Sequence, residues 1–219
     1  MISHLPSTYP RPSEELKVRM PFRGIYWGKR LFDILTSIFV SIFFLSWFLP
    51  IVGLLICIDS KGPVFFIQLR TGRNGRQFRC LKLRTMAHRP DSTFQQATKN
   101  DPRVTRLGAF LRKTNLDEMP QFLNVLVGDM SVVGPRPHAI QHDAQFFHSI
   151  PNYRNRYAIK PGITGLAQTR GLRGETNLKE MQNRVKMDIW YIKNHGPILD
   201  IKICWWTIQK MFKGDEKAV

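Results

Sequence analysis

The stretch from Leu31 to Ile58 is almost wholly apolar, and Asp33 carries its only formal charge. As one continuous helix, its 28 residues would extend roughly 42 Å, whereas the hydrocarbon core of a bilayer is about 30 Å thick. The stretch follows a polar leader that contains prolines, and it is too long for the apolar part of a cleavable signal peptide. We therefore expect a membrane helix.

The expected membrane helix contains a proline, Pro50, with Gly53 close behind it. A proline at this position removes the hydrogen bond to the Ser46 carbonyl and kinks the helix. In lipid the freed carbonyl needs another partner, and the hydroxyls of Ser46 and Ser41 are within reach on a helix. The sequence thus predicts a break between Ser46 and Pro50.

Basic residues flank the apolar stretch on both sides. Because Lys and Arg mark the cytoplasmic side of a membrane helix, we expect both ends to lie on the same face. A re-entrant helix, which enters the bilayer, breaks and returns, satisfies both flanks. The alternative is one ordinary span followed by a basic domain on the outer side. The flanking residues are Arg11, Lys17, Arg19, Arg23, Lys29 and Arg30 before the stretch, and Lys61, Arg70, Arg73, Arg76, Arg79, Lys82 and Arg84 after it.

The chain has 219 residues and a formal net charge of +17, which indicates a polyanionic partner. The partner could be nucleic acid or an anionic lipid surface, and the apolar stretch favours lipid, so we expect no nucleic-acid partner. The three cysteines, Cys57, Cys80 and Cys204, lie far apart. They indicate reduced thiols in the cytoplasm rather than a metal site or a disulfide framework.

The rest of the sequence predicts a mainly α-helical fold with a small β-hairpin, in the α+β class. Residues 64–69 and 77–83 favour strands, and Asn74-Gly75 between them is a strong hairpin signal. A polar loop is expected at 88–103. Helices are expected at 104–127 with Gly128 ending the first, at 138–149, at 177–194 and at 198–212.

The helix at 198–212 is amphipathic, because four large apolar residues fall at helical spacing. They are Ile201, Trp205, Ile208 and Phe212, with Trp206, Lys202, Lys210 and Lys213 nearby. Tryptophan and lysine in this arrangement suit the headgroup layer of a membrane. A helix that packs in the protein core would show the same pattern.

Asp117 and Glu118 are the strongest candidates for chemistry. Thr114 and Asn115 stand three residues before them, so both acids could belong to capping boxes at the start of a helix. Neighbouring positions on a helix diverge by about 100°, so only one of the acids can cap while the other points elsewhere. The pair could therefore be catalytic.

Basic residues near this pair suit phosphate groups. Gly134-Pro135-Arg136-Pro137 fixes the backbone on both sides of one arginine, whose planar guanidinium binds phosphate through two hydrogen bonds. Arg112 lies five residues before Asp117. Lys82 and Arg84, two apart on a predicted strand, point to one face and could form a second phosphate contact. A solvated strand face is the alternative for these two.

A metal site at His138 and His142, with Asp143 and His148 nearby, is a weaker possibility. No metalloprotease glutamate and no cysteine lies close to them. A polar helix face explains these residues better.

Several motifs together resemble those of bacterial sugar transferases, the monotopic phosphoglycosyl transferases that initiate glycan assembly on polyprenyl phosphate. The resemblance covers residues 24–213. The motifs, in order, are Lys29-Arg30-Leu31-Phe32-Asp33, Lys82-Leu83-Arg84-Thr85-Met86, Asp101-Pro102-Arg103-Val104-Thr105, Leu116-Asp117-Glu118-Met119-Pro120-Gln121, Asn124-Val125-Leu126-Val127-Gly128-Asp129-Met130-Ser131, Val133-Gly134-Pro135-Arg136-Pro137 and Lys160-Pro161-Gly162-Ile163-Thr164-Gly165.

The resemblance implies that a UDP-sugar gives its sugar 1-phosphate to undecaprenyl phosphate and releases UMP. It implies a covalent intermediate with Asp117 as nucleophile, Glu118 as the second catalytic acid, and Mg²⁺ held by Asp117 or Glu118. Arg112, Arg136, Lys82 and Arg84 would then bind the phosphates. A position at a helix N-terminus would lower the pKa of Asp117 and keep it ionised.

The resemblance also implies a location on the cytoplasmic face of a bacterial inner membrane and a role in making a surface polysaccharide or glycan. We expect a leader at 1–28, the re-entrant segment at 29–60, the catalytic domain at 61–213 with amphipathic interfacial helices, and a tail at 214–219. The family commonly breaks its membrane helix at an adjacent Ser-Pro pair, whereas Trp47 follows Ser46 here. The rival hypotheses are a Mg²⁺-dependent nucleotide-sugar hydrolase and a non-catalytic basic membrane anchor.

Overall fold

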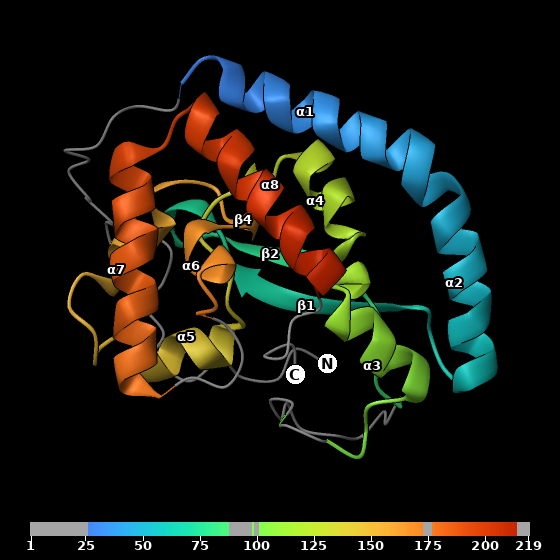
Figure 1. The fold of residues 1–219 in the computed structure, drawn as a ribbon. Coiled ribbons are helices and arrows are strands. Elements are labelled where there is room, and N and C mark those ends of the chain that lie inside the picture. Colours follow the sequence, from blue (N-terminus) through green and yellow to red (C-terminus); the bar gives the residue numbers. More distant parts are fainter. Residues whose placement is uncertain (1–25, 88–97, 99–100, 173–176, 214–219) are drawn as a thin grey trace.

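The computed structural model describes residues 26–87, 98, 101–172 and 177–213 (Figure 1). Most of the expected leader, the tail at 214–219 and most of the expected loop at 88–103 lie outside the described residues.

One long helix opens the described part of the chain. It consists of α1 (Gly28–Val40), a π-helical turn (Ser41–Leu45) and α2 (Ser46–Asp59). Together these 32 residues are long and apolar enough to cross a membrane. Only 22% of the most apolar window is buried, so this is not the core helix of a soluble domain. Figure 1 shows that the helix bends where α1 meets α2.

The helix changes its hydrogen bonding one turn earlier than the sequence predicts. The π-helical turn ends at Leu45, and Pro50 lies inside α2. The Ser46 hydroxyl donates to the Ile42 carbonyl at 2.6 Å and not to its own carbonyl, and the Trp47 indole donates to the Phe43 carbonyl at 2.8 Å. The expected position of the break is thus corrected to the turn before Ser46, where side chains serve the carbonyls that the π-helical turn exposes.

The predicted β-hairpin is confirmed. β1 (Phe65–Thr71) pairs antiparallel with β2 (Gln77–Leu83), and Thr71 lies opposite Gln77. Asn74 and Gly75 take φ values of 58° and 75° in the turn, a conformation that asparagine and glycine tolerate. A second small sheet was not predicted: β3 (Ser131–Val133) pairs parallel with β4 (Gly162–Thr164).

The helix predicted at 104–127 is two helices. α3 (Arg106–Lys113) ends before Asn115, which has a φ of 59°, and a 3₁₀ turn (Leu116–Glu118) leads to α4 (Gln121–Val127). The prediction of one continuous helix is therefore wrong, because a left-handed residue interrupts the apolar pattern. Gly128 ends α4 with a φ of 97°, as the sequence predicts.

The remaining elements are α5 (Ile140–Phe146), a 3₁₀ helix (Tyr153–Ala158), α6 (Leu166–Thr169), α7 (Leu178–Asn194) and α8 (Pro197–Lys213). The helices α5, α7 and α8 follow the predicted order, whereas the 3₁₀ helix at 153–158 and α6 were not predicted. Asn177 caps α7 by accepting a hydrogen bond from the backbone N–H of Glu180 at 2.9 Å.

The main core lies where α4, α7 and α8 pack around β2 and β3 (Figure 1). Its fully buried members include Cys80, Val125, Met130, Ile192 and Ile203. A second cluster joins α2 to α3 through Leu45, Phe48, Val52, Ile56 and Leu111. The long helix thus packs on the rest of the chain along one side, while its other side is exposed.

The start of the long helix is fixed by buried polar contacts. Lys29 forms an ion pair with Asp200 of α8 at 2.7 Å, and Asp33 accepts hydrogen bonds from the Ser131 hydroxyl and the Val132 N–H, both at 2.9 Å. Arg30 donates to the Val125 and Leu126 carbonyls at the end of α4, at 2.7 and 3.0 Å. These contacts give the Lys29–Asp33 motif a structural role.

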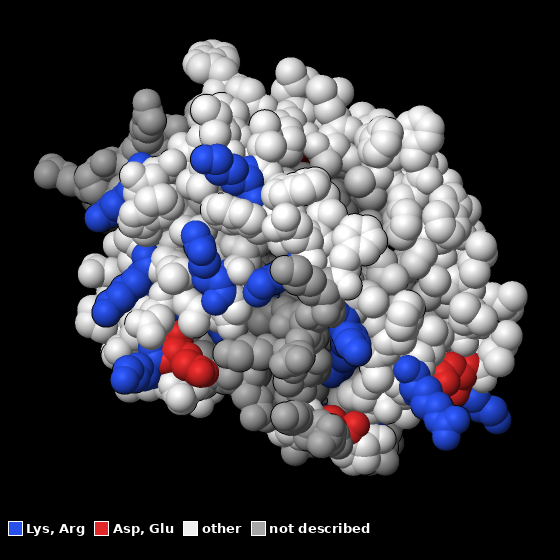
Figure 2. Space-filling view, in the orientation of Figure 1, with Lys and Arg blue, Asp and Glu red and all other residues white. Residues whose placement is uncertain are grey.

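The predicted apolar stripe of α8 faces outward. Ile201, Trp205, Ile208 and Phe212 are between 45% and 89% exposed, whereas Ile203 on the opposite side is fully buried. The core-helix alternative is therefore wrong for this stripe. Figure 2 shows an almost uncharged surface over α1 and the upper part of α2, with Lys and Arg side chains gathered over the region of α6 to α8.

Candidate active site

Three segments bring charged residues together at the junction of α3 and α4. Asp117 and Glu118 lie in the 3₁₀ turn between these helices and are buried. Lys82, on β2, places its Nζ 2.7 Å from Glu118 Oε1 and 3.7 Å from Asp117 Oδ2. Arg136 binds both carboxylate oxygens of Glu118, with Nη1 to Oε2 at 2.9 Å and Nη2 to Oε1. The predicted residues Lys82, Asp117, Glu118 and Arg136 therefore form one cluster.

The capping-box alternative does not describe this turn. The Thr114 hydroxyl donates back to the Phe110 and Leu111 carbonyls at 2.9 and 3.2 Å, and so completes the end of α3. Glu118 directs its carboxylate to Lys82 and Arg136. The acids thus lie at a break between helices.

Arg112 adds a third cation next to Asp117. Its Nε donates to the Thr85 hydroxyl at 2.8 Å, which orients the guanidinium at the end of α3. Burial lowers the pKa of Arg112, and the charge of Asp117 is the largest influence that raises it. The two side chains therefore interact electrostatically.

Arg136 is held by two glycine-containing turns that pack backbone to backbone. Gly162 donates its N–H to the Pro135 carbonyl at 2.9 Å. A Cβ on Gly162 would lie 2.1 Å from the nitrogen of Gly134, and no real Cβ approaches another atom so closely. The motifs around Gly134 and Gly162 therefore need glycine, because their contact fixes the backbone that carries Arg136.

A buried arginine that the sequence reasoning missed supports the same turn. Arg156 donates from Nη2 to the Arg136 carbonyl at 2.8 Å and from Nε to Asp188 at 2.7 Å. No sequence signal identifies it, because its partners lie 20 and 32 positions away along the chain. It holds the main chain beneath a predicted site residue.

The predicted histidine pair belongs to this buried network. His138 lies within 2.8 Å of the Tyr153 hydroxyl, and burial, followed by the charge of Arg156, lowers its pKa well below the usual value. His142 packs against the His138 ring. Among the described residues, no group of three or more His, Cys, Asp or Glu is arranged to hold a metal ion.

Arg84 is not brought to the cluster. Its guanidinium donates to the carbonyls of Ile56, Ser60 and Lys61 at the end of α2, at distances from 2.6 to 3.1 Å. β2 ends at Leu83, so the alternation that predicts one face for Lys82 and Arg84 no longer applies there. Arg84 stabilises the C-terminus of the long helix, whose last carbonyls have no partner within the helix.

The pKa of Asp117 departs from the expectation. Burial raises it, the charge of Lys82 lowers it, and the neighbouring charge of Glu118 raises it, with a net shift upward. The expected lowering by a helix N-terminus is therefore wrong, because Asp117 lies in a 3₁₀ turn before α4 and is desolvated there. A substrate phosphate and its cation would therefore displace few existing hydrogen bonds when they approach the Asp117 carboxylate.

The two acids differ in their fit to Mg²⁺. Both oxygens of Glu118 are bound by Lys82 and Arg136, so this carboxylate is already neutralised. Asp117 is the better ligand, since its nearest described cation is 3.7 Å away. One carboxylate together with substrate phosphates is a common way to bind Mg²⁺. The residues therefore fit a metal shared with a substrate rather than one enclosed by protein.

Residues 25–214 match the sequence profile of the family described as bacterial sugar transferase. A UDP-glucose:undecaprenyl-phosphate glucose-1-phosphate transferase from Klebsiella pneumoniae is 48% identical over 195 residues, which cover 88% of this chain and 42% of that protein. The exopolysaccharide production protein PSS of Rhizobium leguminosarum bv. phaseoli is 46% identical over 188 residues, which cover 82% of this chain and 92% of that protein.

A UDP-N-acetylgalactosamine-undecaprenyl-phosphate N-acetylgalactosaminephosphotransferase from Aeromonas hydrophila is 39% identical over 188 residues, which cover 85% of this chain and 44% of that protein. The chain thus spans less than half the length of the Klebsiella and Aeromonas relatives.

Proposed function

The chain belongs to the bacterial sugar transferase family, and from this premise we propose that it transfers a sugar 1-phosphate from a UDP-sugar to undecaprenyl phosphate and releases UMP. This step would begin the assembly of a surface polysaccharide. The observation that carries the proposal is the cluster of Lys82, Arg112 and Arg136 around the two buried acids. The names of several relatives favour UDP-glucose as donor, and the Aeromonas relative makes UDP-N-acetylgalactosamine the second choice.

Asp117 is the proposed nucleophile. Its carboxylate oxygen attacks the β-phosphorus of the UDP-sugar, the bond from this phosphorus to the bridging oxygen breaks, and UMP leaves with the bonding electrons. The product is an aspartyl phosphate that still carries the sugar. This route splits one displacement into two steps. Lys82, Arg112 and Arg136 reduce the repulsion between the carboxylate and the phosphates.

Glu118 acts as a positioning residue in this scheme. Because it binds Lys82 and Arg136 at once, it holds their charges beside the phosphate that reacts. Mg²⁺, when bound by Asp117 and the diphosphate, would neutralise charge on the leaving UMP. The sequence left the role of Glu118 open, and its two bonds to cations favour orientation over metal binding.

The acceptor completes the reaction. An oxygen of undecaprenyl phosphate attacks the phosphorus of the intermediate, the bond to the Asp117 oxygen breaks, and the carboxylate is restored. Phe66, which is 47% exposed, lies opposite Lys82 in the hairpin and gives the site an apolar edge. An apolar residue beside a phosphate-binding lysine suits an acceptor whose phosphate is joined to a hydrocarbon chain.

We also propose that residues 29–60 form a re-entrant membrane segment and that residues 61–213 lie as the catalytic domain on the cytoplasmic face of a bacterial inner membrane. The exposed apolar side of α1 and α2, the bend between them, and the outward stripe of α8 support this arrangement. Both ends of the long helix are tied to the same domain, through Lys29 and Arg84.

UMP release by purified protein in nanodiscs tests the proposal. The reaction contains Mg²⁺ and UDP-glucose or UDP-N-acetylgalactosamine, with or without undecaprenyl phosphate. We expect release that depends on the acceptor and is abolished by Asp117→Asn. Asp129→Asn is the matched control, because Asp129 is an exposed acid outside the cluster, and this variant should keep full activity.

The rival hypotheses predict different outcomes. Release without the acceptor, with continued turnover, would identify a nucleotide-sugar hydrolase. Equal behaviour of wild type and Asp117→Asn with both donors, combined with binding to anionic vesicles that weakens steeply with salt, would identify a non-catalytic membrane anchor.

A further inference from the structure

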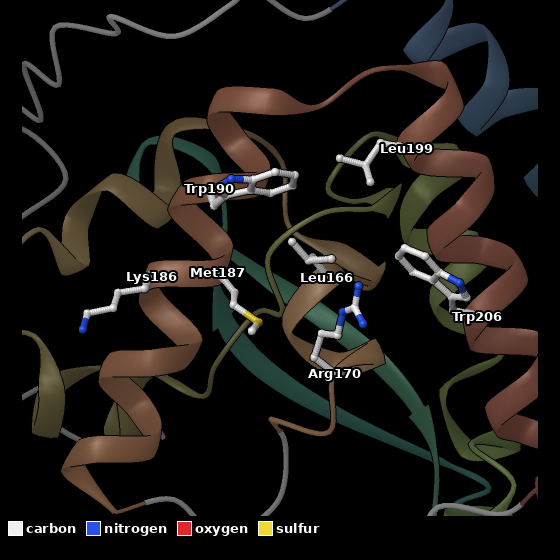
Figure 3. Close-up of a pocket in the computed structure, with 7 residues that line it drawn as sticks. All are labelled: Leu166, Arg170, Lys186, Met187, Trp190, Leu199 and Trp206. Atoms are coloured by element: carbon white, nitrogen blue, oxygen red, sulfur yellow. The ribbon is translucent and has the colours of Figure 1, made fainter.

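A pocket lies between α6, α7 and α8, apart from the catalytic cluster (Figure 3). Its volume is about 420 Å³. Five of its residues are apolar or aromatic, and two are basic. The lining residues are Leu166, Arg170, Lys186, Met187, Trp190, Leu199 and Trp206. None of them belongs to the cluster around Asp117.

The walls of this pocket suit a hydrocarbon chain. Leucine, methionine and two tryptophans supply its surface, and none of the lining residues carries a carboxylate or an amide side chain. A nucleotide base or a sugar would lose its hydrogen bonds to water here without replacing them. An acyl chain has no such bonds to lose.

Two basic side chains, Arg170 and Lys210, lie beside the apolar pocket at the end of α6. The Arg170 guanidinium lies 5.0 Å from the centre of the Trp206 ring. Lys210 follows Trp206 by one helical turn, and its Nζ donates to the Gln168 carbonyl at 3.1 Å, close to the end of α6. Figure 3 shows the Lys186 side chain directed away from the pocket. Arg170, which lines the pocket, and Lys210, which lies near it at the end of α6 without lining the pocket, are therefore the cations nearest to an anionic group at the pocket rim.

The pocket and the exposed stripe lie on adjacent faces of α8, because neighbouring helix positions diverge by about 100°. Trp206, in the pocket wall, follows Trp205, which is 59% exposed on the stripe. Figure 2 shows Lys and Arg side chains gathered on the same side of the molecule. A helix that lies in the headgroup layer would thus place this pocket beside the first layer of phospholipids.

We propose that this pocket binds one anionic phospholipid. An acyl chain lies against Trp190, Met187 and Leu199, and the headgroup phosphate is bound by Arg170 and Lys210. The positive charge of Arg170 and Lys210 favours an anionic lipid. A zwitterionic headgroup carries its own cation, which competes with these two side chains for the phosphate. This inference rests on the proposed membrane contact of α8 but not on the proposed chemistry.

Fluorescence quenching tests the site. The tryptophans of the chain are Trp27, Trp47, Trp190, Trp205 and Trp206. Replacing Trp27, Trp47 and Trp205 by phenylalanine leaves only the two that line the pocket. This protein is titrated in detergent with phosphatidylglycerol or phosphatidylcholine, each brominated on its acyl chains. We expect phosphatidylglycerol to reach half-maximal quenching at a concentration at least about tenfold lower than phosphatidylcholine does.

Two double variants locate the headgroup. Arg170→Gln with Lys210→Gln should make the two lipids equal. Arg106→Gln with Lys179→Gln removes the same charge from exposed positions on α3 and α7, and it should preserve the preference. Equal quenching by both lipids before any basic residue is changed would overturn the proposal, as would a preference that survives the loss of Arg170 and Lys210.

A second measurement does not depend on the tryptophan variants. Native mass spectrometry of the otherwise unchanged protein should retain phosphatidylglycerol over phosphatidylcholine from an equal mixture, and the Arg170 and Lys210 double variant should lose this selectivity. Equal retention of the two lipids would contradict the site even if the fluorescence variants were unfolded. UMP release by the same preparations shows whether the catalytic proposal fails or stands independently.

Discussion

Replacing Arg84 by glutamine separates a structural role from a phosphate-binding role. Arg84 is 6% exposed and donates to three carbonyls at the end of α2. The Ile56 carbonyl also accepts from the Ser60 N–H, at 3.1 Å, and keeps that partner. Glutamine has one amide group and is shorter, so at most about two carbonyls, those of Ser60 and Lys61, lose their partner. A carbonyl left without a partner costs about 1–3 kcal/mol when it is buried, so two of them predict a loss of up to about 2–6 kcal/mol.

This loss is large compared with the typical stability of a folded domain, about 5–15 kcal/mol. For a chain of this size, 1 kcal/mol corresponds to about 2–4 °C in the unfolding midpoint, so we expect a decrease of about 4–24 °C. The assay is thermal unfolding in nanodiscs, followed by intrinsic fluorescence. Well below the midpoint, kcat and the KM for the UDP-sugar should stay close to the wild-type values, because the guanidinium points away from the catalytic cluster.

Arg79→Gln is the control for this experiment, since Arg79 is an exposed arginine on the same strand. It should change the midpoint by no more than the small effect typical of surface substitutions, about 0.5 kcal/mol. An unchanged midpoint for Arg84→Gln, together with a KM for the donor that rises about tenfold or more, would show that Arg84 binds phosphate and would contradict its structural role.

Two further predictions concern the same region. Gly108→Ala should destabilise the protein by about 1–3 kcal/mol or more, because the added Cβ would lie 2.0 Å from the Thr85 carbonyl oxygen. Gly196→Ala is the control: no atom lies within 4 Å of its added Cβ, so it should hardly change the unfolding midpoint. Equal midpoints for the two variants would contradict the close packing. Glu118→Gln should move the acid limb of the pH profile of kcat/KM to lower pH. Burial raises the pKa of Asp117 and the charge of Glu118 raises it further, so removing that charge lets Asp117 ionise at lower pH. A shift to higher pH would contradict this electrostatic coupling.

Local sequence signals predicted the elements that depend on local chemistry. Asn74-Gly75 specifies the turn of the hairpin and Gly128 ends α4, because each of these residues acts within a few positions of itself. The small parallel sheet was missed, since each of its strands has three residues and is too short to show a period.

The pattern of 104–127 predicts one helix although Thr114 and Asn115 carry signals of a helix start, and it does not place the left-handed residue at Asn115. Tertiary contacts favour the interrupted chain: Glu118 in the 3₁₀ turn binds Lys82, which lies 36 positions earlier. A helix that continued through Asp117 and Glu118 would point one of them away from β2. The break therefore belongs to the site.

The site was predicted in part. Lys82, Arg112, Asp117, Glu118 and Arg136 were identified by residue type and motif, and the structure brings them together. The distinct role of Arg84 depends on β2 ending at Leu83, which the strand pattern cannot locate to one residue. The supporting role of Arg156 depends on contacts between distant segments, which no local pattern encodes.

Mass spectrometry of peptides from the protein tests the covalent step at Asp117. The protein is incubated with UDP-glucose and Mg²⁺ without acceptor, quenched, digested and measured. We expect one added hexose phosphate on the peptide that contains Asp117. This adduct should be absent in Asp117→Asn and should be lost when undecaprenyl phosphate is added before the quench. Acceptor-dependent UMP release with no adduct on any peptide, or an adduct that persists in Asp117→Asn, would contradict it.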